Sequence, residues 1–189
     1  KTFKDTSLWK TLLNDLPKCE GIIAKWFKAL APGLFSESQK TMSNVKAPSF
    51  ISKEYNLPNN HEAFAGNITV TFNEFFNQAH IDNDVSPISY GGFCGINQET
   101  AKIAPLADGF DILFGQFVLP GISTVVELGA VDGWTDICWA SNVLYHQTVK
   151  SLRPLNSPFT RFAFSVQINK TFHDRFSRVA SSENENIVL

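Results

Sequence analysis

Apolar residues follow two different periods along the chain, and the change falls near Asn67. Before that point they recur every three or four positions, which is the period of an amphipathic helix. We expect one helix over residues 6–17, which opens on a Thr-Ser pair and ends at its proline, and a second over residues 19–30. Residues 36–58 are polar and contain two prolines, so the sequence predicts a long loop there with a helical turn.

From residue 68 onward, branched, aromatic and polar residues alternate in short runs bounded by Gly, Pro and Asp-Gly turn signals. Strands are expected at residues 68–72, 86–96, 110–117, 121–128, 134–139, 143–148 and 159–168. The pair Asp132-Gly133 predicts a tight hairpin that would join the fourth and fifth of these strands. Short strands at this even spacing are typical of a β-sandwich or barrel.

The chain is expected to form a single domain. Its 189 residues and 21.0 kDa are enough to fill one core, and nothing in the sequence requires two. The predicted parts are a helical buttress of that domain at residues 1–66, a β core at residues 67–180 and a flexible tail at residues 181–189. The β core would end in a closing helix with Phe172 and Phe176 on one face. The 17 phenylalanines of the chain fit a sheet-rich interior.

Charge and cysteine content narrow the range of partners. A net charge of −2 and a pI of about 6.1 do not support a nucleic-acid partner, although a local basic patch would be enough for one. No apolar run is long enough for a membrane span. The three scattered cysteines are interpreted as buried thiols, with one disulfide and one free thiol as the alternative. Buried thiols slightly favour an intracellular (nuclear or cytoplasmic) location, while two glycosylation sequons leave secretion open. The sequence does not indicate the oligomeric state.

His80 and Asp82 are the first candidate site residues. They lie two positions apart in an extended stretch, so both side chains can point to the same face. His146 lies in a later apolar stretch that could lie opposite in a rolled sheet. Two imidazoles and one carboxylate on one side of a metal form the facial triad of non-heme Fe(II) oxygenases. A His-x-Asp tripeptide alone is common in loops, and the remaining histidines, His61 and His173, are interpreted as solvated or structural.

Arg161 is the candidate anchor for a dicarboxylate, because a guanidinium fork matches a carboxylate with two parallel hydrogen bonds. Its strand is expected to run next to that of His146, with a polar face opposite an apolar one. The polar face is formed by Arg161, Ala163, Ser165 and Gln167. Such a strand would line a pocket; the alternative is a surface strand with Arg161 in solvent.

Several acidic residues lie near these positions without a predicted role as ligands. Asp84 is expected either to orient the site from behind Asp82 or to be solvated. Glu127, Asp132 and Asp136 are interpreted as turn and surface charges.

The triad, Arg161 and four phrases of the sequence resemble the fungal branch of the ten-eleven-translocation and base-J-type 2-oxoglutarate/Fe(II) oxygenases. The phrases are Asn77-Gln78-Ala79-His80-Ile81-Asp82-Asn83-Asp84, Ser86-Pro87, Gly109-Phe110-Asp111 and Gly115-Gln116-Phe117-Val118-Leu119-Pro120. The similarity covers roughly residues 68–176. Because the entire oxygenase superfamily shares the triad, it points to the chemistry far better than to the substrate.

The resemblance implies a mostly β fold with flanking helices, namely a double-stranded β-helix (jelly roll, cupin-like) with N-terminal helices and a C-terminal helix. It implies an Fe(II)- and 2-oxoglutarate-dependent dioxygenase that hydroxylates a C–H bond, with a modified nucleobase as the candidate substrate. Iron would be held by His80, Asp82 and His146, and Arg161 would pair with the distal carboxylate of 2-oxoglutarate, a small-molecule co-substrate. Further co-substrate contacts are expected from Ser165, Gln167 and Tyr90.

The chain departs from the family pattern in two places. Many members carry a serine two residues after the arginine, where this chain has Ala163, and the animal DNA-oxidising members carry a Cys-rich zinc-binding extension that three scattered cysteines cannot provide. A nucleobase would have to be flipped into the pocket, where Tyr90, Phe93 or Trp134 could stack on it.

Two alternatives to this function remain open. A cupin-like interaction protein, for example a secreted effector, would keep the fold without catalysis. A metalloenzyme of the same shape could bind iron without 2-oxoglutarate, in which case Arg161 would be idle.

Overall fold

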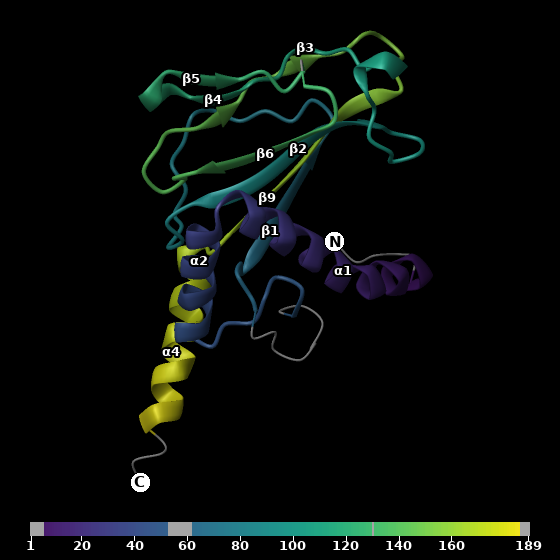
Figure 1. Ribbon diagram of the computed structural model, residues 1–189. Helices are drawn as coiled ribbons and strands as arrows, with labels where there is room; N and C mark the ends of the chain where they lie inside the picture. The colour runs from purple at the N-terminus through teal and green to yellow at the C-terminus, as the bar shows by residue number, and fades with distance from the viewer. Residues whose placement is uncertain (1–5, 53–61, 130, 186–189) are drawn as a thin grey trace. The chain divides into compact units, whose positions relative to one another are not determined.

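The computed structural model describes residues 6–52, 62–129 and 131–185, which belong to two compact units (Figure 1). Residues 68–167 form a β unit, and the segments on either side of it in the sequence form a helical unit. Among the described residues, no helix has the length and apolar character needed to cross a bilayer.

The helical unit contains α1 (Thr6–Leu30), α2 (Pro32–Asn44) and α4 (Lys170–Glu185). Its core is a cluster of phenylalanine rings, in which Phe64 lies 5.2 Å from Phe35 and 6.0 Å from Phe27 between ring centroids. The predicted C-terminal helix is confirmed, and the rings of Phe172 and Phe176 lie 4.9 Å apart on it.

The helix boundaries expected in the first third are wrong in two places. α1 is one continuous helix rather than two, because the exposed Pro17 costs it a backbone hydrogen bond without ending it. The start of the predicted loop 36–58 is instead part of α2, which buries Phe35, Ser38 and Met42 along one stripe. That stripe contains a serine, which weakens the hydrophobic pattern. Residues 53–58 of the predicted loop lie outside the described residues.

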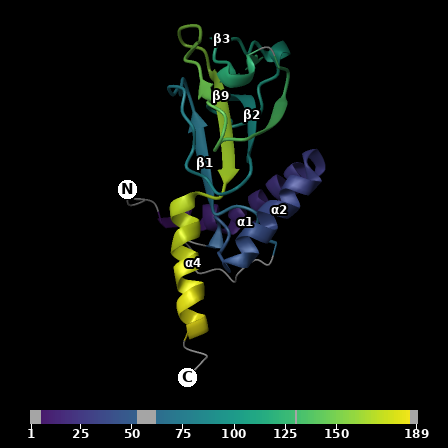
Figure 2. The same cartoon turned by 90° about the vertical axis from the view of Figure 1, so that its left-hand side faces the viewer.

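The β unit is built from two facing layers of strands (Figures 1 and 2). One layer is a four-stranded sheet in the order β1 (Asn67–Phe72), β9 (Phe159–Gln167), β2 (Ser89–Asn97) and β6 (Trp134–Trp139), in which β2 is antiparallel to both its neighbours. The other layer contains the sheet β5 (Thr124–Val126), β4 (Phe117–Leu119) and β7 (Gln147–Thr148), and the pair β3 (Leu113–Phe114) and β8 (Ser151–Leu152).

Aromatic side chains from both layers fill the space between them. Phe93 on β2 and Trp139 on β6 contact Phe117 on β4, with ring centroids 5.6 Å and 5.0 Å apart. The antiparallel sheets pack on this aromatic core, and the helices come before and after them in the sequence. This is the predicted double-stranded β-helix, or jelly roll.

Two pairing predictions are wrong. The turn at Gly133 exists, with φ of +94°, but the strands around it do not form a hairpin: β5 pairs with β4, and β6 pairs with β2 in the other sheet. The strand of Arg161 also does not run beside that of His146, because β9 lies in the four-stranded sheet while β7 belongs to the opposite layer. A local turn signal fixes the chain reversal but does not choose the sheet that each strand joins.

The three cysteines form no disulfide; Cys94 is buried, Cys138 is half-buried and Cys19 is exposed, so the expectation of three buried thiols is wrong for Cys19. The predicted boundaries at residues 66 and 180, and the buttressing role of the helices, stay predictions.

Candidate metal centre

Backbone pairing brings the two halves of the candidate site together. His80 and His146 form an isolated antiparallel bridge, in which each N–H donates to the other's carbonyl at 3.1 Å and 3.0 Å. The Asp82 N–H donates to the Ser141 carbonyl at 2.8 Å, and the Asn77 N–H donates to the Thr148 carbonyl at 3.2 Å. The extended His80 segment therefore lies beside the His146 segment, as the sequence predicts for the two His-bearing stretches.

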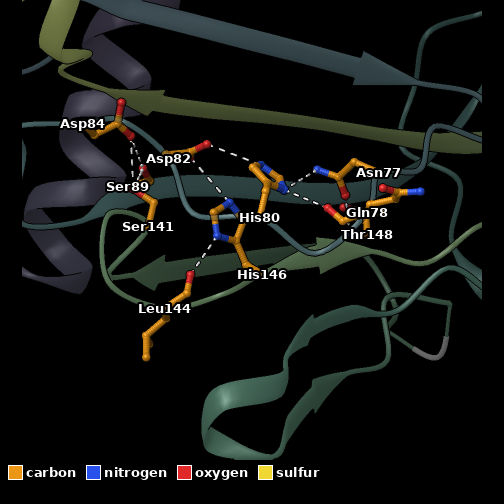
Figure 3. A network of polar contacts seen from close by, with 10 residues as sticks. All are labelled: Asn77, Gln78, His80, Asp82, Asp84, Ser89, Ser141, Leu144, His146 and Thr148. Atoms are coloured by element: carbon orange, nitrogen blue, oxygen red, sulfur yellow. Dashed lines mark hydrogen bonds and ion pairs between the residues drawn. The ribbon is translucent and has the colours of Figure 1, made fainter.

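The donor atoms of His80, Asp82 and His146 converge on one point, and all lie within 4.8 Å of one another (Figure 3). The two Asp82 carboxylate oxygens lie 3.3 Å from His80 Nε2 and 3.4 Å from His146 Nε2. Residues two positions apart on an extended backbone face the same way, so His80 and Asp82 share a face without a special turn.

Hydrogen bonds to the backbone orient both imidazole rings. His80 Nδ1 lies 2.9 Å from the Gln78 carbonyl, and His146 Nδ1 lies 3.1 Å from the Leu144 carbonyl. Because a carbonyl only accepts, each Nδ1 carries the proton, and each neutral ring keeps its lone pair on the Nε2 that faces Asp82. This is the arrangement in which histidines bind metals through Nε2.

Two lone pairs and a carboxylate held this close require a cation or bound protons between them. Burial would raise the pKa of Asp82, but hydrogen bonds and charge from His146 and His80 outweigh it and lower that pKa below its ordinary value. Burial would likewise lower the pKa of His146, but the bond to Asp82 and the Leu144 carbonyl raise it. Within the described residues, this donor set is the one group of His, Cys, Asp or Glu that fits a metal ion.

Asp84 lies behind the triad and is buried rather than solvated, with 8% of its surface exposed. Its carboxylate accepts hydrogen bonds from the hydroxyls of Ser141 (3.0 Å) and Ser89 (3.4 Å), and the Ser89 hydroxyl also donates to Ser141 at 2.7 Å. Burial and the negative charge of Asp82 raise the pKa of Asp84 to about 6. This cluster ties the loop after Asp82 to the Ser141 segment.

The triad opens into a cavity of about 220 Å³ between the two layers. The walls are aromatic side chains and uncharged polar groups, and the triad supplies the only ionisable side chains among them. The cavity is lined by Thr69, Thr71, Phe75, Asn77, Phe93, Phe117, Trp139, Thr148, Ala163, Phe164, Ser165 and Gln167 together with the triad.

Arg161 lies on an adjoining cavity of about 20 Å³ that shares five wall residues with the larger one, Thr71, Phe75, Phe93, Thr148 and Ala163. The side chain is only 8% exposed, so the alternative of a solvated surface arginine is wrong. Its Nη1 donates to the Gly115 carbonyl and its Nη2 to the Phe75 carbonyl, both at 2.7 Å. Its Nε is buried and has no hydrogen-bond partner among the described residues.

The remaining predicted residues divide into two groups. Ser165 and Gln167 line the triad cavity, as the alternation along β9 predicts. Tyr90 is not brought to the cavity, because it is fully buried and its hydroxyl donates to Asp136 at 2.5 Å. Asp136 is half-buried and also accepts from Trp134 Nε1 at 2.7 Å.

Sequence reasoning missed two residues that hold Arg161, Gly115 and Phe75. Both act through main-chain carbonyls, which every residue type offers, so no side-chain pattern could reveal them. The one available signal is glycine itself, because Gly115 has φ of +82° and a Cβ there would lie 3.0 Å from Arg161 Nη1.

A family model identifies the relatives of this chain. A family model described as the Tet-like 2OG-Fe(II) oxygenase superfamily matches residues 2–151, which is 150 of the 189 residues. The matched span contains His80, Asp82 and His146 and ends ten residues before Arg161. No curated protein matches the chain.

Proposed function

The chain belongs to the Tet-like 2OG-Fe(II) oxygenase superfamily, and we propose that it is an Fe(II)- and 2-oxoglutarate-dependent dioxygenase that hydroxylates a C–H bond of its substrate. The observation that carries the proposal is the convergence of His80, Asp82 and His146 on a cavity that shares walls with a second cavity, which the buried Arg161 lines.

His80 Nε2, His146 Nε2 and an Asp82 oxygen would hold the iron. The Nδ1 proton of each imidazole is directed to a backbone carbonyl, so the two Nε2 atoms offer lone pairs and the Asp82 carboxylate offers negative charge to a cation. Bound iron would supply the activation of dioxygen, coupled to oxidative decarboxylation of 2-oxoglutarate to succinate and CO2. Three ligands on one side leave coordination positions for co-substrate and oxygen.

Arg161 would bind the distal carboxylate of 2-oxoglutarate. A guanidinium has five N–H donors, and the carbonyls of Gly115 and Phe75 take only two of them. Glu74, the acidic residue whose charge acts on Arg161, is paired with Arg153 instead. The buried guanidinium therefore has an unpaired Nε–H and no carboxylate partner among the described residues, which favours an incoming carboxylate.

The aromatic walls would keep water from the reacting groups. Phe93 and Phe75 line both cavities, and Phe117 packs 6.1 Å from the His146 ring. Low polarity around the triad strengthens the electrostatic attraction between the protein and its charged ligands.

We further propose that the chain belongs to the fungal branch related to ten-eleven-translocation and base-J enzymes, and that a modified nucleobase supplies the C–H bond. Of the three aromatic residues considered for stacking, Phe93 lines the cavity, whereas Tyr90 and Trp134 pack against Phe164. Phe93 is therefore the candidate that could contact a flipped base.

Anaerobic titration with Fe(II) and 2-oxoglutarate, followed by the visible charge-transfer absorbance, tests the proposal. The parent should develop the band, His80→Ala should lose it, and Arg161→Ala should need at least tenfold more 2-oxoglutarate. His173→Ala is the matched control, because it removes an imidazole from α4 and should leave the band unchanged.

A folded parent that develops no band would rule out a 2-oxoglutarate site and favour the interaction-protein alternative. A band in the parent that Arg161→Ala leaves unaltered would remove Arg161 from co-substrate binding.

A further inference from the structure

The cavity-lining face of β9 is longer than 2-oxoglutarate can cover. Residues two apart on a strand are separated by about 6.7 Å, so Ser165 and Gln167 lie about 13 Å and about 20 Å beyond Arg161 along the backbone. The four C–C bonds of 2-oxoglutarate, each about 1.5 Å, span at most about 6 Å. A co-substrate anchored on Arg161 passes Ala163, which lines both cavities, and leaves Gln167 for another molecule.

Gln167 carries a polar atom that lacks a partner. Its Oε1 is buried and accepts no hydrogen bond from the described residues, although the residue lines the triad cavity. A buried carbonyl oxygen left in this state costs about 1–3 kcal/mol, so such groups normally mark a ligand or a bound water.

Trp139, on the same cavity, carries the opposite kind of unpaired group. Its Nε1–H is buried and has no acceptor among the described residues, and its ring lies 5.6 Å from the His146 ring. The cavity thus presents an unused acceptor on β9 and an unused donor on β6.

The other walls define the chemistry of the group that enters. Apart from the triad, every lining side chain is uncharged, so a charged group on the substrate would have no counter-ion. An uncharged N–H next to a C=O, the lactam edge of a compact heterocycle, offers a donor for Gln167 and an acceptor for Trp139.

We propose that Gln167 is the specificity-determining residue of this site and accepts a hydrogen bond from the N–H of an uncharged lactam edge on the substrate. The proposal rests on the proposed function. It moves Gln167 from the co-substrate to the substrate, and it holds whether the lactam belongs to a free base or to a base in a strand.

Binding to the anaerobic protein loaded with Fe(II) and 2-oxoglutarate, measured by calorimetry, tests the proposal. Thymine and a single-stranded oligothymidylate are the two probes, and 1,3-dimethylthymine keeps the ring and carbonyls but lacks both N–H groups. We expect dimethylthymine to bind at least tenfold more weakly than thymine, since a site built for a hydrogen bond rejects an analogue that lacks it. Comparison of the affinities for the oligonucleotide and for free thymine shows whether the site prefers a base in a strand or a free base.

Gln167→Met keeps the length of the side chain and removes the acceptor. It should weaken binding of the preferred probe at least tenfold and leave the charge-transfer band and the 2-oxoglutarate affinity unchanged. The exposed Gln98→Met is the matched control and should match the parent.

The proposal is overturned if dimethylthymine binds as tightly as thymine, if neither probe binds the loaded parent, or if Gln167→Met affects 2-oxoglutarate instead. A parent without the band marks failure of the proposed function. A normal band without selectivity for the N–H refutes the role of Gln167 alone.

Discussion

Replacement of Gly115 by alanine separates the cost of backbone strain from the loss of co-substrate binding. Gly115 has φ of +82°, and an alanine Cβ would lie 3.0 Å from Arg161 Nη1, 3.1 Å from its Cζ and 3.0 Å from Ser151 Cβ. These contacts are tighter than most Cβ contacts in proteins, so the guanidinium must shift by a few tenths of an ångström, which disturbs its 2.7 Å hydrogen bond to the Gly115 carbonyl.

The expected magnitude has two parts. An L-residue in the left-handed region costs about 1–2 kcal/mol of stability wherever it occurs. Loss of a hydrogen bond from a charged group costs about 1.5–3 kcal/mol, and if that cost falls on co-substrate binding, the affinity for 2-oxoglutarate drops about ten- to hundredfold.

Gly133→Ala is the matched control, because Gly133 has φ of +94° but no atom within 4 Å of the added Cβ. Both variants should lose about 1–2 kcal/mol in the free energy of unfolding, measured by urea denaturation. Only Gly115→Ala should need more 2-oxoglutarate in the anaerobic charge-transfer titration. Equal 2-oxoglutarate affinities for the two folded variants would refute the role of Gly115 in positioning Arg161.

Three further predictions concern charge and exposure. The pKa of His146 is raised, so a proton on its imidazole competes with the metal ion. Mn(II) affinity, measured by calorimetry, should fall by on the order of tenfold per pH unit below that pKa. An affinity that stays constant from pH 8 to 5.5 would contradict this prediction. Asp84 has a pKa raised to about 6, so ionisation destabilises the metal-free protein as pH rises from about 4 through 6. Asp84→Asn should therefore raise the unfolding free energy at pH 7.5 by at most about 3 kcal/mol and have little effect near pH 4, and an equal effect at both pH values would count against a buried charge. Iodoacetamide at pH 8 should modify the exposed Cys19 in the native protein and spare Cys94, whose burial raises its pKa to about 11. Mass spectrometry of the peptides measures both, and modification of Cys94 at the rate of Cys19 would contradict this prediction.

The metal centre was predictable from sequence because its ligands depend on two short-range rules. The period of a strand places His80 and Asp82 on one face, and a rolled sheet lets a distant strand bring His146 opposite. The hairpin at Gly133 failed because it concerns which sheet a strand enters. That choice depends on the packing of Phe117 between Phe93 and Trp139, which no local pattern records.

Tyr90 shows the limit of assigning side chains by residue type. It lies on β2 between β9 and β6, where an aromatic side chain could point either toward the opposite layer or away from it. Its hydroxyl has a carboxylate partner in Asp136, and burial and this bond raise the pKa of Tyr90, so the group is satisfied inside the structure. The hydrogen bond to Asp136 offsets the cost of burying the Tyr90 hydroxyl, so this group needs no ligand.

Two unpaired polar atoms lie on the polar face of β9, one near each end. Arg161 and Gln167 each keep a buried polar atom without a partner, at opposite ends of one strand face. Ala163 lies between them and has no polar side-chain group. A single short ligand cannot satisfy both ends, because the separation of about 20 Å exceeds its length. The partner of Gln167 is therefore a molecule other than the co-substrate, and the proposal assigns this place to the substrate, beside the triad on the same cavity.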